Sequence, residues 1–192
     1  MSDFAHISSL PPEVIEQCAY WNDPNCSTGF PIVIYAAGDL DDHSEHIYSA
    51  QIGLGNTINR IDEGFSSSID AFLSKRVGRW QPDQWYNSTP YCNNEARGNY
   101  LDLYSRIPAC DEYPFASTWQ GGPVNYGYGE VSLKLVSQIE SRLQGKLMGQ
   151  FYSSTGVIAN DPILSWFGVI TMPYTQVNSF WITRNGDFGS YR

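Results

Sequence analysis

The sequence predicts an α+β fold, a single domain with a central antiparallel sheet that disulfide bonds stabilise. Residues 130–136 alternate apolar and polar side chains, as a half-buried strand does, and residues 137–152 repeat apolar side chains every four residues, as an amphipathic helix does. The length of 192 residues suits one domain with a real hydrophobic core. An aromatic content of 15%, with 17 glycines and 11 prolines, favours a loop-rich, strand-containing secreted domain over a helical bundle.

The N-terminal part of the chain is expected to alternate loops with short elements of secondary structure. An apolar run predicts a strand over residues 30–35. A polar turn is expected over residues 39–46, followed by a short helix or strand over 47–54. A group of serines precedes three apolar residues at helical spacing, which predicts a helix over 66–76. Residues 79–91 are rich in Trp and Tyr and are expected to form a loop.

The C-terminal half is expected to contain two successive strands followed by a helix. Residues 110–122 are interpreted as a strand and a turn, and the strand at 130–136 leads into the helix at 137–152. The order strand, strand, helix is a ββα unit. Ser137 and Glu140 have the spacing of a capping box at the start of the helix. A final strand pair is predicted at 163–171 and 180–183, with Asn185-Gly186 as a turn.

The apolar side of the predicted helix is formed by Ile139, Leu143, Leu147 and Phe151, which recur every four residues. Such a repeat places the four side chains on one side of an α-helix. The helix is therefore expected to pack that side against the core.

The four cysteines indicate an oxidising environment, because no Cys-x-x-Cys pair suggests a zinc site or a redox motif. Four cysteines allow three pairings, and neighbour pairing is predicted, which joins Cys18 to Cys26 and Cys92 to Cys110. The chain does not open with a basic segment and an apolar segment, so the expectation is a secreted protein whose signal was removed or a domain cut from a longer chain. The apolar runs are too short to span a bilayer, and no membrane partner is expected.

The stretch from Cys110 to Gly122 is the most informative part of the chain. It places two adjacent carboxylates, an aromatic-proline corner and a double glycine within thirteen positions. A disulfide-anchored strand followed by a glycine turn would explain the cysteine, the proline and the glycines but not the adjacent acids. The segment therefore predicts an active-site strand and turn.

This segment resembles the hallmark of the NucA/NucB-type extracellular deoxyribonucleases, which here reads Asp111-Glu112-Tyr113-Pro114 followed by Gln120-Gly121-Gly122. A second similarity follows on the predicted helix, in the order Ser141, Arg142, Leu143, Gln144 and Gly145. The resemblance covers about residues 90–172. Residues 1–60 are expected to be an extension that packs on this core, within one nuclease-like domain over residues 1–192.

The resemblance implies a one-metal nuclease site of the His-Me finger type on the ββα unit. It makes Asp111 the general base, with adjacent Glu112 raising its pKa or only orienting water or backbone. One divalent cation is implied, Mg²⁺ or Mn²⁺, with Ser141 as a ligand where the family usually has Asn. Glu140 is a second candidate ligand, although its role in the capping box competes. Gln144 lies one turn from Glu140 and is expected to reach the site or a phosphate.

A net charge of −9 opposes a nucleic-acid partner unless basic residues or bound cations gather locally. Arg142 and Lys146 stand four residues apart and form a candidate basic strip, to which Lys134 adds from the preceding strand. Gln120 replaces the acidic residue that several relatives carry before Gly-Gly and is counted with the substrate-binding residues.

The polar run from Asp41 to His46 contains a His-x-x-His pair with flanking acids. Such a pair can bind zinc or calcium, but a solvated acidic loop is the favoured interpretation. Relatives carry a histidine in a comparable segment, so His46 is a candidate for the wall of the active site. His46 is also the best alternative general base.

Together these features predict a secreted, metal-dependent, non-specific endonuclease that hydrolyses DNA. A monomer is expected, with an inhibitor or immunity protein as a further partner. One alternative is a catalytically degenerate module that keeps the nuclease fold for binding, which Ser141 and the acidic charge favour. Others are a nuclease toxin domain acting on DNA or RNA and, more distantly, a carbohydrate-binding aromatic surface.

Overall fold

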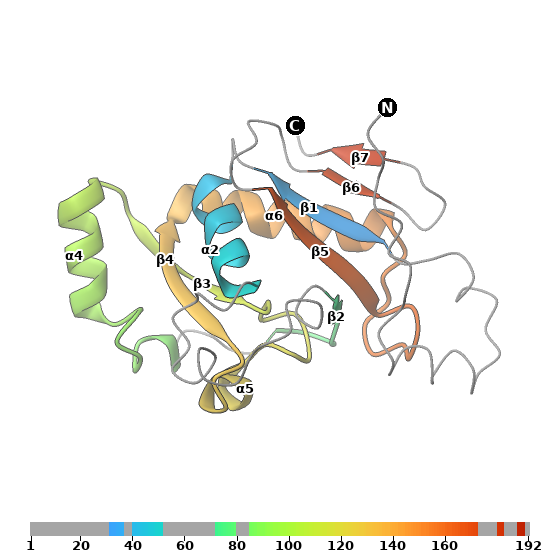
Figure 1. The fold of residues 1–192 in the computed structure, drawn as a ribbon, viewed down its shortest axis with the longest axis horizontal. Coiled ribbons are helices and arrows are strands. Elements are labelled where there is room, and N and C mark those ends of the chain that lie inside the picture. The colour runs from blue at the N-terminus through green and yellow to red at the C-terminus, as the bar shows by residue number, and fades with distance from the viewer. Residues whose placement is uncertain are drawn as a thin grey trace.

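The computed structural model describes residues 31–36, 40–51, 72–79, 85–172, 180–182 and 188–190, which form an α+β fold, as predicted (Figure 1). The strands are β1 (Ile32–Ala36), β2 (Phe72–Ser74), β3 (Pro108–Tyr113), β4 (Ser132–Ser137), β5 (Trp166–Met172), β6 (Phe180–Ile182) and β7 (Phe188–Ser190). The helices among these residues are α2 (Asp41–Gln51), α4 (Asn94–Tyr104), α5 (Pro123–Gly127) and α6 (Gln138–Ser154). None of the helices in this part of the chain is long and apolar enough to cross a bilayer.

The strands form a five-stranded sheet in the order β2-β5-β1-β6-β7 and a separate hairpin of β3 and β4. The prediction of a wholly antiparallel central sheet is wrong, because β1 pairs in parallel with β5, with Val33 opposite Val169. The predicted pairing of the last strands is wrong too. β1 lies between β5 and β6, and β6 pairs with β7. The proposed turn at Asn185-Gly186 lies outside the described residues.

Helix α2 replaces the predicted polar turn at residues 39–46. Asp41 and Asp42 occupy its first turn, where negative charge stabilises the N-terminus of a helix. Ile47 and Ala50 are fully buried, and the hydroxyl of Ser44 donates to the backbone oxygen of Tyr35, 3.0 Å away. Polar residues therefore face inward here because the structure gives them partners, which a periodicity of apolar residues does not reveal.

The predicted helix over residues 66–76 is also wrong at its described end. Residues Phe72–Ser74 form the edge strand β2, which pairs antiparallel with β5. Pairing with a distant strand thus outweighs the local helical spacing. The rest of that predicted helix lies outside the described residues.

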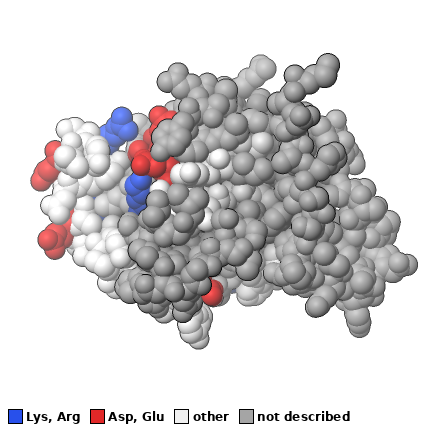
Figure 2. All heavy atoms as spheres, viewed as in Figure 1, with Lys and Arg blue, Asp and Glu red and all other residues white. Residues whose placement is uncertain are grey.

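Helix α4, which the sequence did not suggest, lies at one end of the molecule (Figure 1). Asn93 caps it by accepting from the backbone N–H of Ala96, and none of its residues is buried. The disulfide Cys92–Cys110 joins its start to β3, as predicted, with 5.7 Å between the Cα atoms. Cys18 and Cys26 lie outside the described residues. On the face in Figure 2, described acidic and basic side chains lie side by side near this end.

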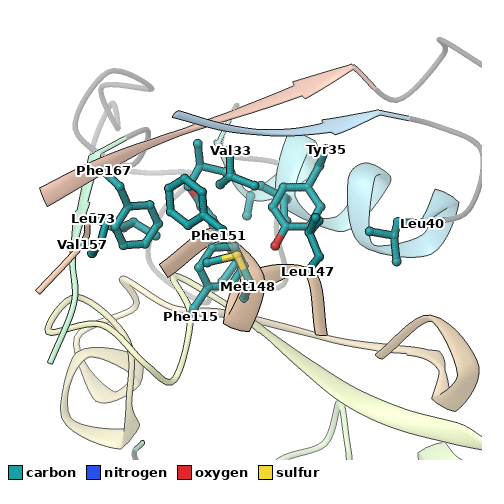
Figure 3. Close-up of a cluster of buried hydrophobic side chains, with 14 residues drawn as sticks. Val33, Tyr35, Leu40, Leu73, Phe115, Leu147, Met148, Phe151, Val157 and Phe167 are labelled. Atoms are coloured by element: carbon teal, nitrogen blue, oxygen red, sulfur yellow. The ribbon is translucent and has the colours of Figure 1, made fainter. Parts of the chain in front are cut away.

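Helix α6 is present almost where the sequence placed it, and it packs against the large sheet (Figure 3). Leu147 and Phe151 are fully buried among side chains of β1 and β5, and Leu143 is partly buried. The expected inward position of Ile139 is wrong, since 71% of this residue is exposed. The apolar face therefore begins one turn later than predicted.

The capping box at the start of α6 is wrong as well. The Ser137 side chain makes no capping hydrogen bond, and its backbone N–H donates to Asp42 Oδ2, 3.1 Å away. Asp42 of α2 thus accepts the hydrogen bond from Ser137 that the capping box assigned to Glu140 of α6. This contact joins the starts of the two helices beside the β3–β4 hairpin.

Candidate active site

A cavity of about 510 Å³ opens between the signature strand, helix α6 and the segment after β2. Four of the predicted site residues line it: Asp111, Glu112, Ser141 and Gln144. The hairpin and α6 therefore bring the two halves of the predicted site to one place, although they are separated by α5 and β4 along the chain.

Asp111 is 6% exposed and is held by two histidines of α2. Its Oδ2 lies 2.6 Å from His46 Nδ1, and its Oδ1 lies 3.5 Å from His43 Nε2. Burial alone favours the neutral acid, but the charges of the two histidines and the hydrogen bond from His46 hold the pKa of Asp111 below its usual value. The expectation that Glu112 raises this pKa is therefore wrong, and Asp111 is an ionised carboxylate.

His46 has partners on both ring nitrogens. Besides Asp111 at Nδ1, it has Ser132 Oγ of β4 at 3.0 Å from Nε2. An ionised carboxylate can only accept, so Nδ1 carries the proton. His46 is 1% exposed and does not line the cavity. It therefore orients Asp111 from the side of the carboxylate that faces away from the cavity.

His43 stands between two carboxylates, with Nε2 3.5 Å from Asp111 and Nδ1 3.6 Å from Glu140 Oε2. The ring is fully buried, and neither nitrogen has a hydrogen-bond partner among the described residues. Burial lowers the pKa of His43, but the negative charges of Asp111 and Glu140 outweigh it and raise the pKa. The two histidines correct the interpretation of residues 41–46 as a solvated acidic loop.

Glu112 is 3% exposed and accepts two hydrogen bonds, from the hydroxyl of Tyr86 and from the backbone N–H of Gly122. Burial raises the pKa of Glu112 to about 7, although the two hydrogen bonds and the nearby charge of Arg79 lower it. Glu112 thus ties the signature strand to the double-glycine turn. Of its two predicted roles, this contact corresponds to the orientation of neighbouring backbone.

The predicted residues of α6 separate into two groups. Ser141 and Gln144 line the cavity, whereas Arg142 and Lys146 are exposed and do not. Glu140 does not line it either, and its Oε2 accepts from the backbone N–H of Asp42, 2.9 Å away. Outside the helix, Gln120 holds the signature turn against β2, since its Oε1 accepts from the backbone N–H of Ser74, 3.0 Å away.

A divalent cation fits this site only as an ion that keeps most of its water. Among the described residues, no group of three or more His, Cys, Asp and Glu side chains could enclose a metal ion. Glu140 and Ser141 offer a carboxylate and a hydroxyl near the start of α6. The buried nitrogens of His43 lack hydrogen bonds among the described residues, and Nδ1 lies 3.6 Å from Glu140 Oε2. Hard oxygen donors and few protein ligands suit Mg²⁺.

Comparison with known families identifies a match over the part of the chain that holds β3, β4 and α6. Residues 86–163 match the family model described as Deoxyribonuclease NucA/NucB. This part of the chain is similar to the NucA/NucB deoxyribonuclease family. The match confirms the resemblance predicted for the signature and the following helix, and the name of the family describes nucleases that act on DNA. No curated protein and no solved structure matches the chain.

The NucA/NucB segment contains only part of the candidate site. It includes Asp111, Ser141 and Gln144 but begins after α2 and after the segment that follows β2. The histidines were visible as a His-x-x-His pair, yet their surroundings suggested a surface loop. Three further cavity-lining residues, Lys75, Arg76 and Arg79, were missed, and the only available signal was three basic residues within five positions.

Proposed function

We propose that the chain is a metal-dependent endonuclease that hydrolyses phosphodiester bonds of DNA in the cavity lined by Asp111. The observation that carries this proposal is the ionised, rigidly held carboxylate of the family signature on the same cavity as Ser141 and Gln144. Recognition through phosphates reads little base sequence, which favours non-specific cleavage.

Phosphodiester hydrolysis needs an acceptor for the proton of the attacking water and a means to neutralise developing charge. In this proposal Asp111 accepts the proton, and His46 and His43 fix its orientation. His46 is the weaker candidate for the base, because Asp111 and Ser132 occupy its two nitrogens. The amide of Gln144 is placed to donate to a phosphate oxygen. When bound by Glu140 and Ser141, Mg²⁺ or Mn²⁺ would supply charge neutralisation at the scissile phosphate.

Export, a monomeric state and an inhibitor or immunity protein as partner belong to the same proposal. The disulfide Cys92–Cys110 supports export, because such bonds persist in oxidising compartments and are rare in the cytosol. An exported nuclease can act as a free enzyme or as the toxic domain of a delivered protein, and both would use the chemistry described above.

Nicking of supercoiled plasmid with Mg²⁺ or Mn²⁺ tests the proposal. We expect cleavage that EDTA abolishes and that Asp111→Asn reduces by about 100-fold or more, because the amide cannot accept the proton. Asp102→Asn makes the same chemical change at an exposed position of α4 and should leave the rate unchanged. Equal rates for the two variants would contradict the assignment of Asp111.

The second candidate is a catalytically degenerate module that binds through the nuclease fold. Serine in place of the usual asparagine at position 141 and the net charge of −9 favour it. DNA binding without cleavage by the wild-type chain in either metal would support this module. Cleavage gained in Ser141→Asn would identify the serine as the cause. Parallel digestion of RNA and DNA of matched sequence decides which nucleic acid is the substrate.

A further inference from the structure

The segment after β2 carries Lys75, Arg76 and Arg79, and all three line the cavity that contains Asp111. It lies outside the matched family segment at residues 86–163. We infer that these three cations, the basic edge, bind the sugar-phosphate backbone of the nucleic acid and hold it against the site. This inference rests on the proposed nuclease function, because it assigns the substrate-binding residues of that same cavity.

The backbone of the basic edge is fixed from two sides. The N–H of Lys75 donates to the oxygen of Ser165 at 2.9 Å, and the N–H of Arg76 donates to the oxygen of Ser117 at 3.0 Å. The oxygen of Lys75 also accepts from the N–H of Asn160 at 2.9 Å. The edge is thus bound both to the signature loop and to the segment before β5. Cations on such a segment meet a phosphate at a small cost in ordering.

Two of the three side chains are oriented by aromatic rings. The Lys75 ammonium lies 4.4 Å from the ring centroid of Tyr152, and the Arg76 guanidinium lies 5.3 Å from that of Trp119. The faces of aromatic rings attract cations, so these contacts hold the two charged groups in place. Burial lowers the pKa of Lys75, as expected for an ammonium that has lost part of its water. An anionic phosphate would replace the lost water.

The distribution of charge favours the same conclusion. The chain has 11 Lys and Arg against 20 Asp and Glu, so its overall field repels nucleic acid and binding must rely on local cations. On the face in Figure 2, described basic side chains lie beside acidic ones. The basic edge concentrates three cations within five positions at the cavity itself. Arg142 and Lys146, the pair favoured by the sequence, do not line the cavity.

Binding of a fluorescein-labelled oligonucleotide, followed by anisotropy across a salt series with Asp111→Asn as the parent, tests this inference without cleavage. Each phosphate contact contributes about 0.7 to 0.9 to the slope of log Kd against log salt. The triple variant Lys75→Gln, Arg76→Gln and Arg79→Gln should lower the slope by about 2, which corresponds to binding weakened by about 100-fold at ~0.1 M salt. Arg79→Gln alone, at an exposed side chain, should show about one third of the effect on the slope.

Two controls separate charge from folding. Arg106→Gln removes a cation at an exposed position outside the cavity and should leave the slope unchanged. Arg79→Lys keeps the charge and should retain the parent slope. If the triple variant loses its native circular dichroism, Arg79→Gln decides the question, because its side chain is exposed.

The outcomes distinguish this inference from the proposed function. A triple variant that binds as the parent does would overturn the basic edge, even where the wild-type enzyme cleaves DNA. A loss of slope in Arg142→Gln with Lys146→Gln, but not in the triple variant, would overturn it as well and place the substrate on α6. If the wild-type chain neither binds nor cleaves DNA, the proposed function fails and the inference fails with it.

Discussion

Glu112 is the buried acid of the signature whose pKa lies closest to neutrality. Burial favours its neutral form, and the pKa rises from 4.5 to about 7 in the folded chain. In the unfolded chain the same carboxyl would ionise near its ordinary value. Between these two pH values the folded state binds the proton more tightly than the unfolded state does. A rise in pH through this range therefore destabilises the fold.

We expect the free energy of unfolding of the wild-type chain to fall by up to about 3 kcal/mol between pH ~4.5 and ~7 because of Glu112. In Glu112→Gln this loss should disappear, because an amide does not ionise and can still accept from Gly122 and donate to Tyr86. Urea denaturation at several pH values measures the difference. Glu130→Gln changes an exposed carboxyl and should keep the wild-type dependence. The same fall in the Glu112→Gln chain would disprove the prediction.

Asp111, Ser141 and Gln144 could be named from the sequence because a local signature and a helical spacing carry them. His43 and Lys75 could not be placed in the same way. His43 reaches Asp111 only because α2 packs against the hairpin, and Lys75 reaches the cavity only because β2 pairs with β5. The role of Ser137 was misread for a related reason, since its cap comes from a different helix. Such contacts depend on tertiary packing, which one sequence does not display.

The double-glycine turn positions the signature strand relative to β2 and the cavity. Gly122 adopts a φ of 94°, which favours glycine, and its N–H reaches Glu112. A Cβ on Gly121 would lie 2.3 Å from the backbone oxygen of Phe115. The turn therefore needs glycine at both positions, for backbone conformation at one and for close approach at the other.

We expect Gly121→Ala to lower the free energy of unfolding by about 3 kcal/mol, because a backbone oxygen cannot move aside cheaply. Gly98→Ala in α4 is the matched control, because a Cβ at this position would have no atom of the described residues within 4 Å. It should raise the stability by about 0.5 to 1 kcal/mol, as alanine favours a helix over glycine. Chemical denaturation measures both. Similar stabilities for the two variants would show that the turn accommodates a side chain.

Elements with their own periodicity were predictable, and those defined by distant partners were not. β4 alternates with period two and α6 repeats every four residues, and both lie almost where the sequence placed them. By contrast, α2 buries polar residues, and β2 is only three residues long and depends on β5. Helix α4 buries none of its residues, so it has no apolar face to detect.

Described residues outside the family segment form part of the large sheet and of the hydrophobic core. β1 lies inside the five-stranded sheet, and α2 contacts the hairpin, α6 and β5. Val33 and Tyr35 of β1 belong to the core cluster that also holds Phe151 (Figure 3). The sequence treated residues 1–60 as an extension packed on a core, but the residues described from that region form part of the core.

We therefore expect the fragment 86–163 to lack a cooperative unfolding transition, although it contains the whole family match. Without β1 and β5, the apolar face of α6 loses the sheet on which it packs, and without α2, His46 no longer holds Asp111. Thermal unfolding by circular dichroism, with the full chain measured in parallel, provides the test. A sharp transition in the fragment, with native-like helix content, would show that the family segment folds on its own.

The parallel pairing of β1 with β5 has a consequence for the order of folding. During synthesis β1 emerges early, while both of its neighbours in the sheet, β5 and β6, come from the C-terminal part of the chain. Contacts so distant in sequence close slowly, because the loop entropy must be lost before any pairing energy is gained. Until then an apolar strand with two open edges is available to chaperones or to aggregation. The nascent protein thus stays without its central sheet, and without a competent cavity, until nearly all the residues described here have been made.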